Sequence, residues 1–330
     1  MKFLKIFGLT ILIIVVLFVL VSLFLPSKVV VERSMVINST APVIFNQINT
    51  LKNWEKWSPW HQIDPEMKLT YEGPPGGKEA AYKWESTHPK VGNGILKITE
   101  SIPFGFIETT MDFMESGVAT GSYKLEKVVD GIKVTWRMET ELGMNPFAKY
   151  FGLMMDAMIG PDFEKGLNNL KTLCESLPPI IIDTETIPPQ TIISIRETCK
   201  PAEISQKLGA IYGELMAFIQ ANRLKQAGPV LAIYHSYSPD KVDMEPAIPV
   251  DRVVKPTGKI KIGELRGDNV VVGYHYGSYE TSGTSHQILD EWITKNKKKI
   301  SGACWEVYIT DPASEPDTNK WLTKIYYPVK

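Results

Sequence analysis

Residues 191–330 contain an internal repeat, and this repeat limits the possible folds of the chain more than any other feature. Each half reads as a strand, a helix and two further strands. The halves share glycine, tyrosine and X-Pro-Val positions: Gly228 with Gly302, Tyr234 with Tyr308, and residues 248–250 with residues 327–329. Two such βαββ units predict one antiparallel sheet with both helices on one face and the other face free to curve around a ligand.

Three motifs in this region resemble the GyrI-like small-molecule-binding domain. They are "YGSYE" (276–280), "WEVYITDP" (305–312) and the terminal "LTKIYYPV" (322–329). Domains of this family form the effector-binding half of AraC-type and BmrR-type regulators and occur in the DNA gyrase inhibitory protein. The resemblance therefore implies a pocket for a small molecule. No helix-turn-helix segment precedes the domain in this chain, which argues against a transcription factor.

Glu306 interrupts an otherwise strand-forming run and is the main candidate for a ligand contact. Strand alternation places it on one face with Cys304 and Tyr308, and places the more apolar Trp305 on the other face. We therefore expect Trp305 to pack beneath the helices and Glu306 to face the open side of the sheet. The repeat counterpart of Glu306 is Ala232, so the strand itself does not require an acid.

The resemblance implies that this acid lies on the floor of a pocket ringed by aromatic side chains, where it meets cationic or polar ligands. A buried carboxylate is costly unless a cation or hydrogen bonds match it, and aromatic faces add cation–π attraction. The other candidate ligand-binding residues are aromatic: Tyr308, Tyr276, Tyr234 and Trp292. The alternatives are a solvated strand residue for Glu306 and core packing for the aromatic residues, which is favoured for Trp292. Glu245 is a weaker candidate for a second acid, with solvent exposure favoured.

The sequence contains no recognised catalytic set. It has no nucleophile elbow, P-loop or dinucleotide fingerprint, and the histidines at 235, 275 and 286 lack partners at metal-ligand spacing. We therefore expect a binding protein rather than an enzyme, without metal or cofactor. The alternative is a hydrolase, because some GyrI-like domains resemble hydrolases whose pocket glutamate activates water with help from a tyrosine. Glu306 with Tyr276 or Tyr308 would do this if burial raised the pKa of Glu306 towards neutrality.

Residues 28–176 read as a strand, a helix, several short strands and a long helix. The short strands form a predicted antiparallel meander at about 67–72, 80–86, 94–100, 106–114, 119–128 and 132–141. Gly160-Pro161 is expected to kink or interrupt the long helix.

This order of elements, with "LKNWEKWSPWHQIDP" and "VTWRMETEL", resembles the START-like (SRPBCC, polyketide cyclase/dehydrase) superfamily over about residues 30–175. The resemblance implies a helix-grip fold, in which the long helix closes a curved sheet over a cavity for an apolar ligand. We expect Trp54, Trp57 and Trp60 to lie in the core or at the cavity rim.

Residues Ile6 to Leu25 form a run of 20 residues without charge, preceded by Lys2 and Lys5. Such a run is long enough to span the hydrocarbon core of a bilayer. It ends in "LFLPSK", without a good cleavage site, so we favour an uncleaved single-pass anchor in the cell membrane over a cleaved signal peptide. The flanking positive charges are nearly balanced, and the short basic N-terminal tail favours a soluble part outside the cytoplasm.

Together these features predict an α+β protein with four segments. They are an N-terminal transmembrane anchor (1–27), a START-like helix-grip domain (28–176), a proline-rich linker (177–190) and a duplicated βαββ, GyrI-like domain (191–330). The net charge is −1 and the basic residues are dispersed, which argues against a nucleic-acid partner. We expect a membrane-anchored protein that binds or senses a small apolar, cationic or amphipathic ligand. Lipid or quinone handling by the START-like domain is the further alternative.

Overall fold

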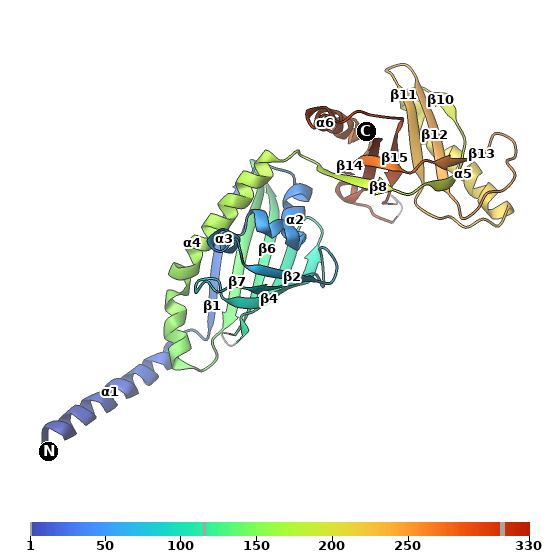
Figure 1. Ribbon diagram of the computed structural model, residues 1–330. Coiled ribbons are helices and arrows are strands. Elements are labelled where there is room, and N and C mark those ends of the chain that lie inside the picture. Colours follow the sequence, from blue (N-terminus) through green and yellow to red (C-terminus); the bar gives the residue numbers. More distant parts are fainter. Residues whose placement is uncertain (1, 115–116, 311–313) are drawn as a thin grey trace. The chain divides into compact units, whose positions relative to one another are not determined.

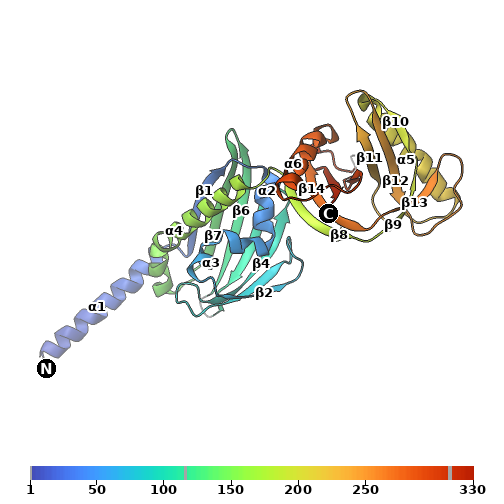
Figure 2. The same ribbon diagram turned by 45° about the horizontal axis from the view of Figure 1, so that its top comes forward.

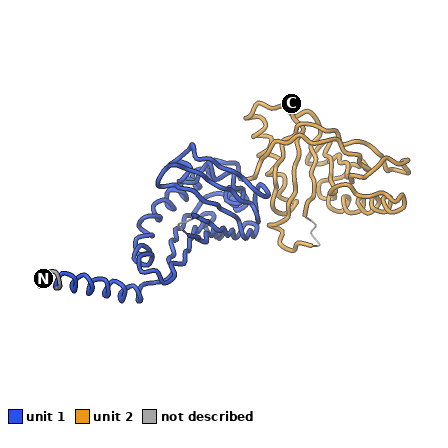
Figure 3. Tube along the Cα trace, turned by 60° about the horizontal axis from the view of Figure 1, so that its bottom comes forward, with its two compact units in different colours: residues 1–179 blue, residues 180–330 orange. Residues whose placement is uncertain are grey.

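The structure is a computed structural model that describes residues 2–114, 117–310 and 314–330. The chain divides into two compact units, residues 1–179 and residues 180–330 (Figure 3). Both units combine an antiparallel sheet with helices, so the predicted α+β class is confirmed.

A long helix, α1 (Lys2–Phe24), opens the N-terminal unit (Figure 1). Its residues Ile6–Phe24 are long and apolar enough to cross a membrane, and no other helix in the described part of the chain is. A signal sequence near the N-terminus would have the same features. The predicted apolar helix is therefore confirmed, whereas its role as an uncleaved anchor stays a prediction.

Seven antiparallel strands form the sheet of the N-terminal unit, in the order β1-β7-β6-β5-β4-β3-β2 (Figure 2). The strands are β1 (Lys28–Ile37), β2 (Lys68–Glu72), β3 (Ala81–Glu85), β4 (Asn93–Ile102), β5 (Phe106–Asp112), β6 (Val118–Val128) and β7 (Gly131–Glu141). Three helical segments lie between the first two strands: α2 (Ala41–Asn49), a 3₁₀ turn (Leu51–Lys56) and α3 (Pro59–Ile63). The long helix α4 (Pro146–Ser176) follows the sheet and packs along β1. The predicted helix-grip arrangement is confirmed.

The core between this sheet and its helices is rich in tryptophan. Trp54 and Trp57 are buried, and each indole N–H donates a hydrogen bond to a backbone carbonyl of α2, over 2.7 and 3.1 Å. Trp136 of β7 stacks on Phe163 of α4 with the ring centroids 4.1 Å apart. The two hydrogen bonds join the segment after α2 to that helix, and the stacked pair joins α4 to the sheet.

Helix α4 continues through Pro161, so Gly160-Pro161 does not interrupt it. A proline inside a helix removes one backbone hydrogen bond, and other contacts must hold the helix there. Arg33 of β1 forms ion pairs with Asp156 (2.8 Å) and Glu164 (2.7 Å), which lie on either side of the proline. Gly160 has no Cβ and leaves room for the guanidinium group. Arg33 thus holds α4 against β1 at the turn where Pro161 removes a backbone hydrogen bond.

We expect Asn145→Ala to loosen the start of α4. The side chain of Asn145 accepts hydrogen bonds from the backbone N–H groups of Phe147 (3.0 Å) and Ala148 (3.4 Å). Loss of such a cap costs about 1 kcal/mol, so amide exchange in the first turn becomes about fivefold faster. Hydrogen–deuterium exchange of the full chain measures this, with the exposed Thr172→Ala on the same helix as control. Equal first-turn exchange in both variants would contradict the capping role.

The C-terminal unit is built on a nine-stranded antiparallel sheet, and eight of the strands follow the order β13-β9-β12-β11-β15-β16-β14-β8. The strands are β8 (Ile181–Ile187), β9 (Gln190–Ser194), β10 (Glu197–Cys199), β11 (Leu231–Tyr237), β12 (Val242–Pro249), β13 (Lys261–Leu265), β14 (Asp268–Tyr276), β15 (Cys304–Tyr308) and β16 (Leu322–Pro328). The two main helices are α5 (Ile204–Ala221) and α6 (Ser282–Lys295). The series β9-α5-β11-β12 and β14-α6-β15-β16 are the predicted βαββ halves, so the duplication is confirmed.

The proline-rich segment 177–190 is not simply a linker. Its residues Ile181–Ile187 form β8, which pairs with β14 of the second half. Strand β13, which precedes the second half, pairs in turn with β9 of the first half. The two Pro-Pro pairs flank β8 rather than interrupting it. Each half therefore receives an edge strand from the segment that precedes the other half, which the repeat alone does not reveal.

Candidate functional site

Glu306 is buried in the C-terminal unit and accepts two side-chain hydrogen bonds. It lies on β15 and is 5% exposed. Its Oε1 lies 2.9 Å from Nε2 of His286 on α6, and its Oε2 accepts a hydrogen bond of 2.7 Å from the hydroxyl group of Tyr308. One partner comes from a helix and one from the sheet, which fixes the carboxylate between them.

The position of Glu306 corrects the predicted face of β15. Gly273 of β14 lies beneath Leu289 of α6, and the ladder from β14 through β16 to β15 places Glu306 on this same face. On β12, the residues that point to this same face belong to the core beneath α5. Both helices therefore lie on the side of the sheet that carries Glu306. Trp305 faces away from the helices and stacks on Tyr326 with the ring centroids 5.3 Å apart. The prediction that Glu306 faces the open side is therefore wrong.

The partners of Glu306 are themselves hydrogen-bonded. Nδ1 of His286 lies 2.8 Å from the hydroxyl group of Tyr327 on β16. The hydroxyl group of Tyr308 lies 3.2 Å from that of Tyr234 on β11. The result is a continuous row of polar groups from α6 across the sheet, with the carboxylate at its centre.

The repeat counterpart of Glu306 lies directly opposite it. Strands β11 and β15 pair antiparallel, and Ala232 is the ladder partner of Glu306. Side chains at such positions are about 5 Å apart. The candidate site is therefore at the junction of the two halves.

The electrostatics of the site favour an ion pair between Glu306 and His286. Burial alone would raise the pKa of Glu306, but the hydrogen bond and charge of His286 outweigh burial and hold this pKa below its ordinary value. Burial likewise opposes a charge on His286, but hydrogen bonds to Cys304 and Glu306 raise its pKa to about 9. At neutral pH the carboxylate is thus already matched by a cation of the protein itself.

These properties bear on the hydrolase alternative. A general base works best with a pKa near the working pH, whereas the pKa of Glu306 is lowered. Tyr308 remains close to Glu306, but strand register places Tyr276 on the opposite face of the sheet. The suggested pair of Glu306 with Tyr276 is therefore not brought together.

The other predicted site residues have separate surroundings. Trp292 packs against the core beneath α6. Glu245 accepts a hydrogen bond of 2.6 Å from Ser194, and its other oxygen lies 2.8 Å from Nε2 of His235. Its side chain is only 18% exposed, so the expectation of a solvent-exposed Glu245 is wrong.

His286 is the site residue to which the sequence reading assigns no role. Helical spacing could have identified it as a residue on the buried side of α6. The buried positions of this helix are Ser285, Leu289 and Ile293. His286 precedes Leu289 by three residues and therefore lies on the same side of the helix. A histidine on the buried side of a helix, next to a strand with a lone acid, would have suggested the pair.

The N-terminal unit contains a cavity of about 600 Å³. Its walls come from the sheet, the tryptophan-rich segment after α2, and α4, and are largely apolar. The main wall residues are Trp54, Trp60, Tyr82, Trp84, Met111, Phe113, Trp136, Met138, Met158 and Phe163. This is the cavity that the START-like resemblance predicts.

His61 supplies a polar group in the wall of this cavity. Both of its ring nitrogens are buried, and neither has a hydrogen-bond partner among the residues that the structure describes. Burial lowers the pKa of His61, against a small opposing effect of Glu55, so the ring is neutral at pH 7. A neutral imidazole offers one donor and one acceptor, and leaving both unpaired is costly. The wall is therefore suited to a ligand with a hydrogen-bonding group.

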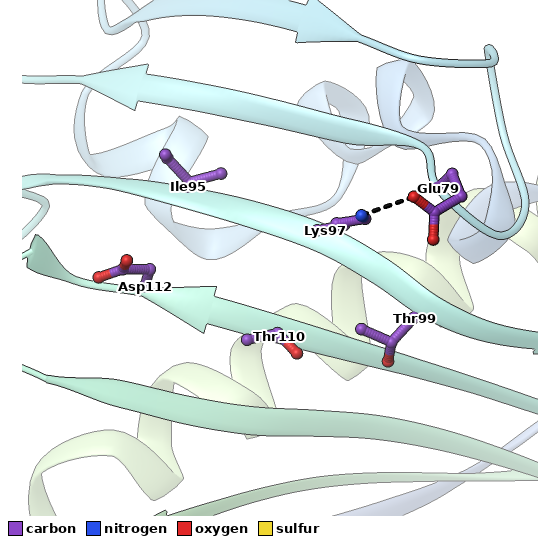
Figure 4. Close-up of a pocket in the computed structure, with 6 residues that line it drawn as sticks. All are labelled: Glu79, Ile95, Lys97, Thr99, Thr110 and Asp112. Atoms are coloured by element: carbon purple, nitrogen blue, oxygen red, sulfur yellow. Dashed lines mark ion pairs between the residues drawn. The ribbon is translucent and has the colours of Figure 1, made fainter.

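A second, open pocket of about 260 Å³ lies on the other face of the same sheet (Figure 4). Lys97 lines this pocket and its neighbour Leu96 lines the cavity. Because neighbouring strand residues point to opposite faces, the two pockets lie on opposite sides of the sheet. Lys97 forms an ion pair of 2.6 Å with Glu79, so its charge is already matched. The described residues also contain no cluster of three or more His, Cys, Asp or Glu side chains that could hold a metal ion.

Comparisons with known proteins place both domains. Residues 28–175 match the family described as polyketide cyclase/dehydrase and lipid transport, and residues 182–330 match the GyrI-like small-molecule-binding domain. No curated protein matches the chain significantly.

Solved structures are also similar to parts of the chain, at low identity. The C-terminal domain of EcmrR is 20% identical, over 46% of this chain and 98% of that chain, with a TM-score of 0.40. EcmrR in a complex with DNA is 21% identical, over 56% of this chain and 68% of that chain, with a TM-score of 0.45. A hydrolase from Listeria innocua is 12% identical, over 47% of this chain and 94% of that chain, with a TM-score of 0.36. The two family matches identify residues 28–175 as a START-like domain of the polyketide cyclase/dehydrase and lipid-transport family, and residues 182–330 as a GyrI-like small-molecule-binding domain.

Proposed function

We propose that this protein is a membrane-tethered binding protein whose START-like domain holds a small apolar or amphipathic molecule. The cavity of about 600 Å³ in that domain carries the proposal. Small-molecule sites are typically cavities of roughly 300–1,000 Å³ with mostly apolar walls and few polar groups. Aromatic and methionine side chains provide most of these walls. The polar lining residues are Ser58, His61, Lys90 and Asp162, and of these His61 has two buried ring nitrogens without a hydrogen-bond partner among the described residues.

The chemistry of the cavity selects the ligand class. Its buried walls favour an extended apolar body, since transfer of apolar surface from water is the main source of affinity. The unpartnered ring of His61 favours one hydroxyl, carbonyl or carboxyl group on that body. Single-chain lipids and quinones both have this composition. The cavity therefore supports the lipid or quinone alternative within the wider binding function.

Filling the cavity is expected to remove the ligand. Met111 of β5 lines the cavity, and its neighbour Thr110 lines the open pocket on the other face. Met111→Trp introduces a bulky indole ring into the ligand volume, whereas Thr110→Trp adds the same ring outside it. Native mass spectrometry of the full chain released from detergent micelles then shows a bound apolar molecule in the wild type and in Thr110→Trp. Its occupancy falls severalfold in Met111→Trp, and equal occupancy in all three proteins would contradict the proposal.

The GyrI-like domain supports a second binding function. Its buried carboxylate is held by His286 and by the hydroxyl group of Tyr308, and the hydroxyl group of Tyr327 contacts His286 in turn. We infer that a small organic cation takes over the position of the imidazolium charge at Glu306, with His286 releasing its proton. Aromatic rings near the site add cation–π attraction for such a ligand. Binding of tetraphenylphosphonium to the full chain, compared with Glu306→Gln, tests this inference.

The membrane location completes the proposal. We assign α1 as an uncleaved single-pass anchor and place the soluble part outside the cytoplasm, because Lys2 and Lys5 lie at the N-terminal end of its apolar run. Protease treatment of intact cells tests the orientation. Digestion of both domains without cell lysis is the expected result, and protection of both domains would reverse the assignment.

A further inference from the structure

One face of α4 changes from apolar to polar halfway along the helix. Phe147, Phe151, Met154 and Met158 follow one another at spacings of four, three and four, which places them on one side. We call these four residues the α4 stripe. They are 75%, 50%, 57% and 52% exposed. The same side continues with polar residues: Asp162, Lys165, Asn169 and Thr172.

This contrast indicates two different environments along one helix. A helix face in water carries polar residues, as the second half of α4 does. Large contiguous apolar surfaces on a soluble domain instead mark a contact with a protein or a membrane. The charged residues between 146 and 159 are Lys149 and Asp156. Lys149 is buried and Asp156 is paired with Arg33, so neither makes the stripe polar.

Helix α1 joins the start of α4 beside the stripe. The ring of Tyr150 stacks on Phe18 at 4.4 Å, and its hydroxyl group donates to the Phe18 carbonyl over 3.1 Å. Phe147 also contacts Phe18, with the ring centroids 5.1 Å apart. The ammonium group of the buried Lys149 donates to the Ser22 carbonyl over 3.1 Å, where a cation stabilises the end of α1. These contacts fix the two helices to each other at this point.

The depth of Phe18 in the membrane determines the depth of the α4 stripe that contacts it. Phe18 precedes Phe24, the last residue of α1, by six residues, which is about 9 Å along a helix. When α1 crosses a bilayer, the side chains that touch Phe18 lie below the level at which α1 ends. The first turns of α4 then reach the interface and the outer part of the acyl chains, where exposed Phe and Met side chains are stable.

We propose that the α4 stripe lies against the lipid bilayer, so that the START-like domain rests on the membrane rather than hanging from a free tether. This inference rests on the proposed anchoring by α1. Met158 is the last residue of the stripe and also part of the cavity wall. The apolar surface that contacts lipid is therefore continuous with the ligand cavity, and an apolar ligand has a route between bilayer and cavity that avoids water.

Nitroxide labels on the full chain in phosphatidylcholine vesicles test this contact. Labels are placed at Phe151→Cys and Met154→Cys on the stripe, at Thr172→Cys on the polar half of the same face, and at Leu12→Cys within α1. The background is Cys304→Ala, because Cys174 and Cys199 are buried and Cys304 is partly exposed. Collision rates with oxygen, which concentrates in lipid, and with a water-soluble nickel chelate are then compared by electron paramagnetic resonance.

The expected result is oxygen accessibility with nickel protection at positions 12, 151 and 154, and the inverse at position 172. Nickel accessibility at 151 and 154 with a lipid-exposed position 12 would overturn this inference and leave the anchor intact. Nickel accessibility at position 12 as well would overturn the anchor together with the inference. Protection of 151 and 154 from both reagents would show a protein partner, such as a second copy, and would also overturn the lipid contact.

Discussion

Replacing His286 with alanine is expected to destabilise the GyrI-like domain by about 3 kcal/mol at pH 7. The substitution leaves the carboxylate of Glu306, which is 5% exposed, without its cationic partner. An unpaired buried charge is costly, and the carboxyl group would have to take up a proton to avoid that cost. Denaturant unfolding of the full chain, followed by near-ultraviolet circular dichroism, measures the change in the free energy of unfolding.

The pH dependence separates the loss of charge from the loss of packing. The pKa of His286 is raised from 6.5 to about 9 in the folded protein. Its charge therefore contributes stability that is fully present below pH 6.5 and is lost as the pH rises through about 9. The difference between wild type and His286→Ala should shrink over this range. The double variant His286→Ala/Glu306→Gln should regain stability at pH 7, and a pH-independent loss in both variants would indicate packing alone.

The second large effect concerns the binding of a permanent cation. Tetraphenylphosphonium does not titrate between pH 7 and 9, so any pH dependence comes from the protein. A cation that replaces the charge of His286 releases one proton while that residue is protonated. Its affinity should therefore rise about tenfold per pH unit well below pH 9, and about 50-fold in all from pH 7 to pH 9. Above about pH 9 the affinity should level off, because His286 is already neutral.

Glu306→Gln should weaken this binding by about 2–5 kcal/mol and abolish its pH dependence, because the charge that the cation meets is gone. Glu245→Gln is the matched control, since Glu245 is also partly buried and also paired with a histidine. Equilibrium dialysis of the full chain in a nonionic detergent measures both affinities. Equal affinities of the two variants, or equal wild-type affinities at pH 7 and pH 9, would show that the cation does not bind at Glu306.

Local patterns in the sequence predict most of the fold. The meander strands are predicted within two residues of their observed ends, because alternating runs bounded by Gly and Pro define them. The repeat likewise predicts both βαββ halves. Strand β8 is missed because its pairing is not local, as the register of Asp183 with Val272 shows. No pattern within 177–190 indicates a partner so distant in the sequence.

The candidate site is predicted only in part. Strand alternation correctly groups Glu306 with Tyr308, but it cannot tell which group faces the helices. The more apolar group faces away, because the helix-free side has a core of its own that includes Trp305. The contact with His286 depends on the rotation of α6 over the sheet, and the orphaned nitrogens of His61 depend on side-chain packing. Helical spacing places His286 on the buried side of α6, but it does not fix which strand residue His286 contacts.

The pairing of Ala232 with Glu306 has a consequence for stoichiometry. Of the four residue pairs between β11 and β15, this is the one that joins equivalent positions of the two halves. The local twofold axis of the duplicated domain therefore passes between these two residues, and a second acid at 232 would face the first at about 5 Å as a buried like charge. Only one of the two equivalent positions, 232 and 306, can therefore carry an acid. The proposed cation site thus occurs once in the duplicated domain rather than twice.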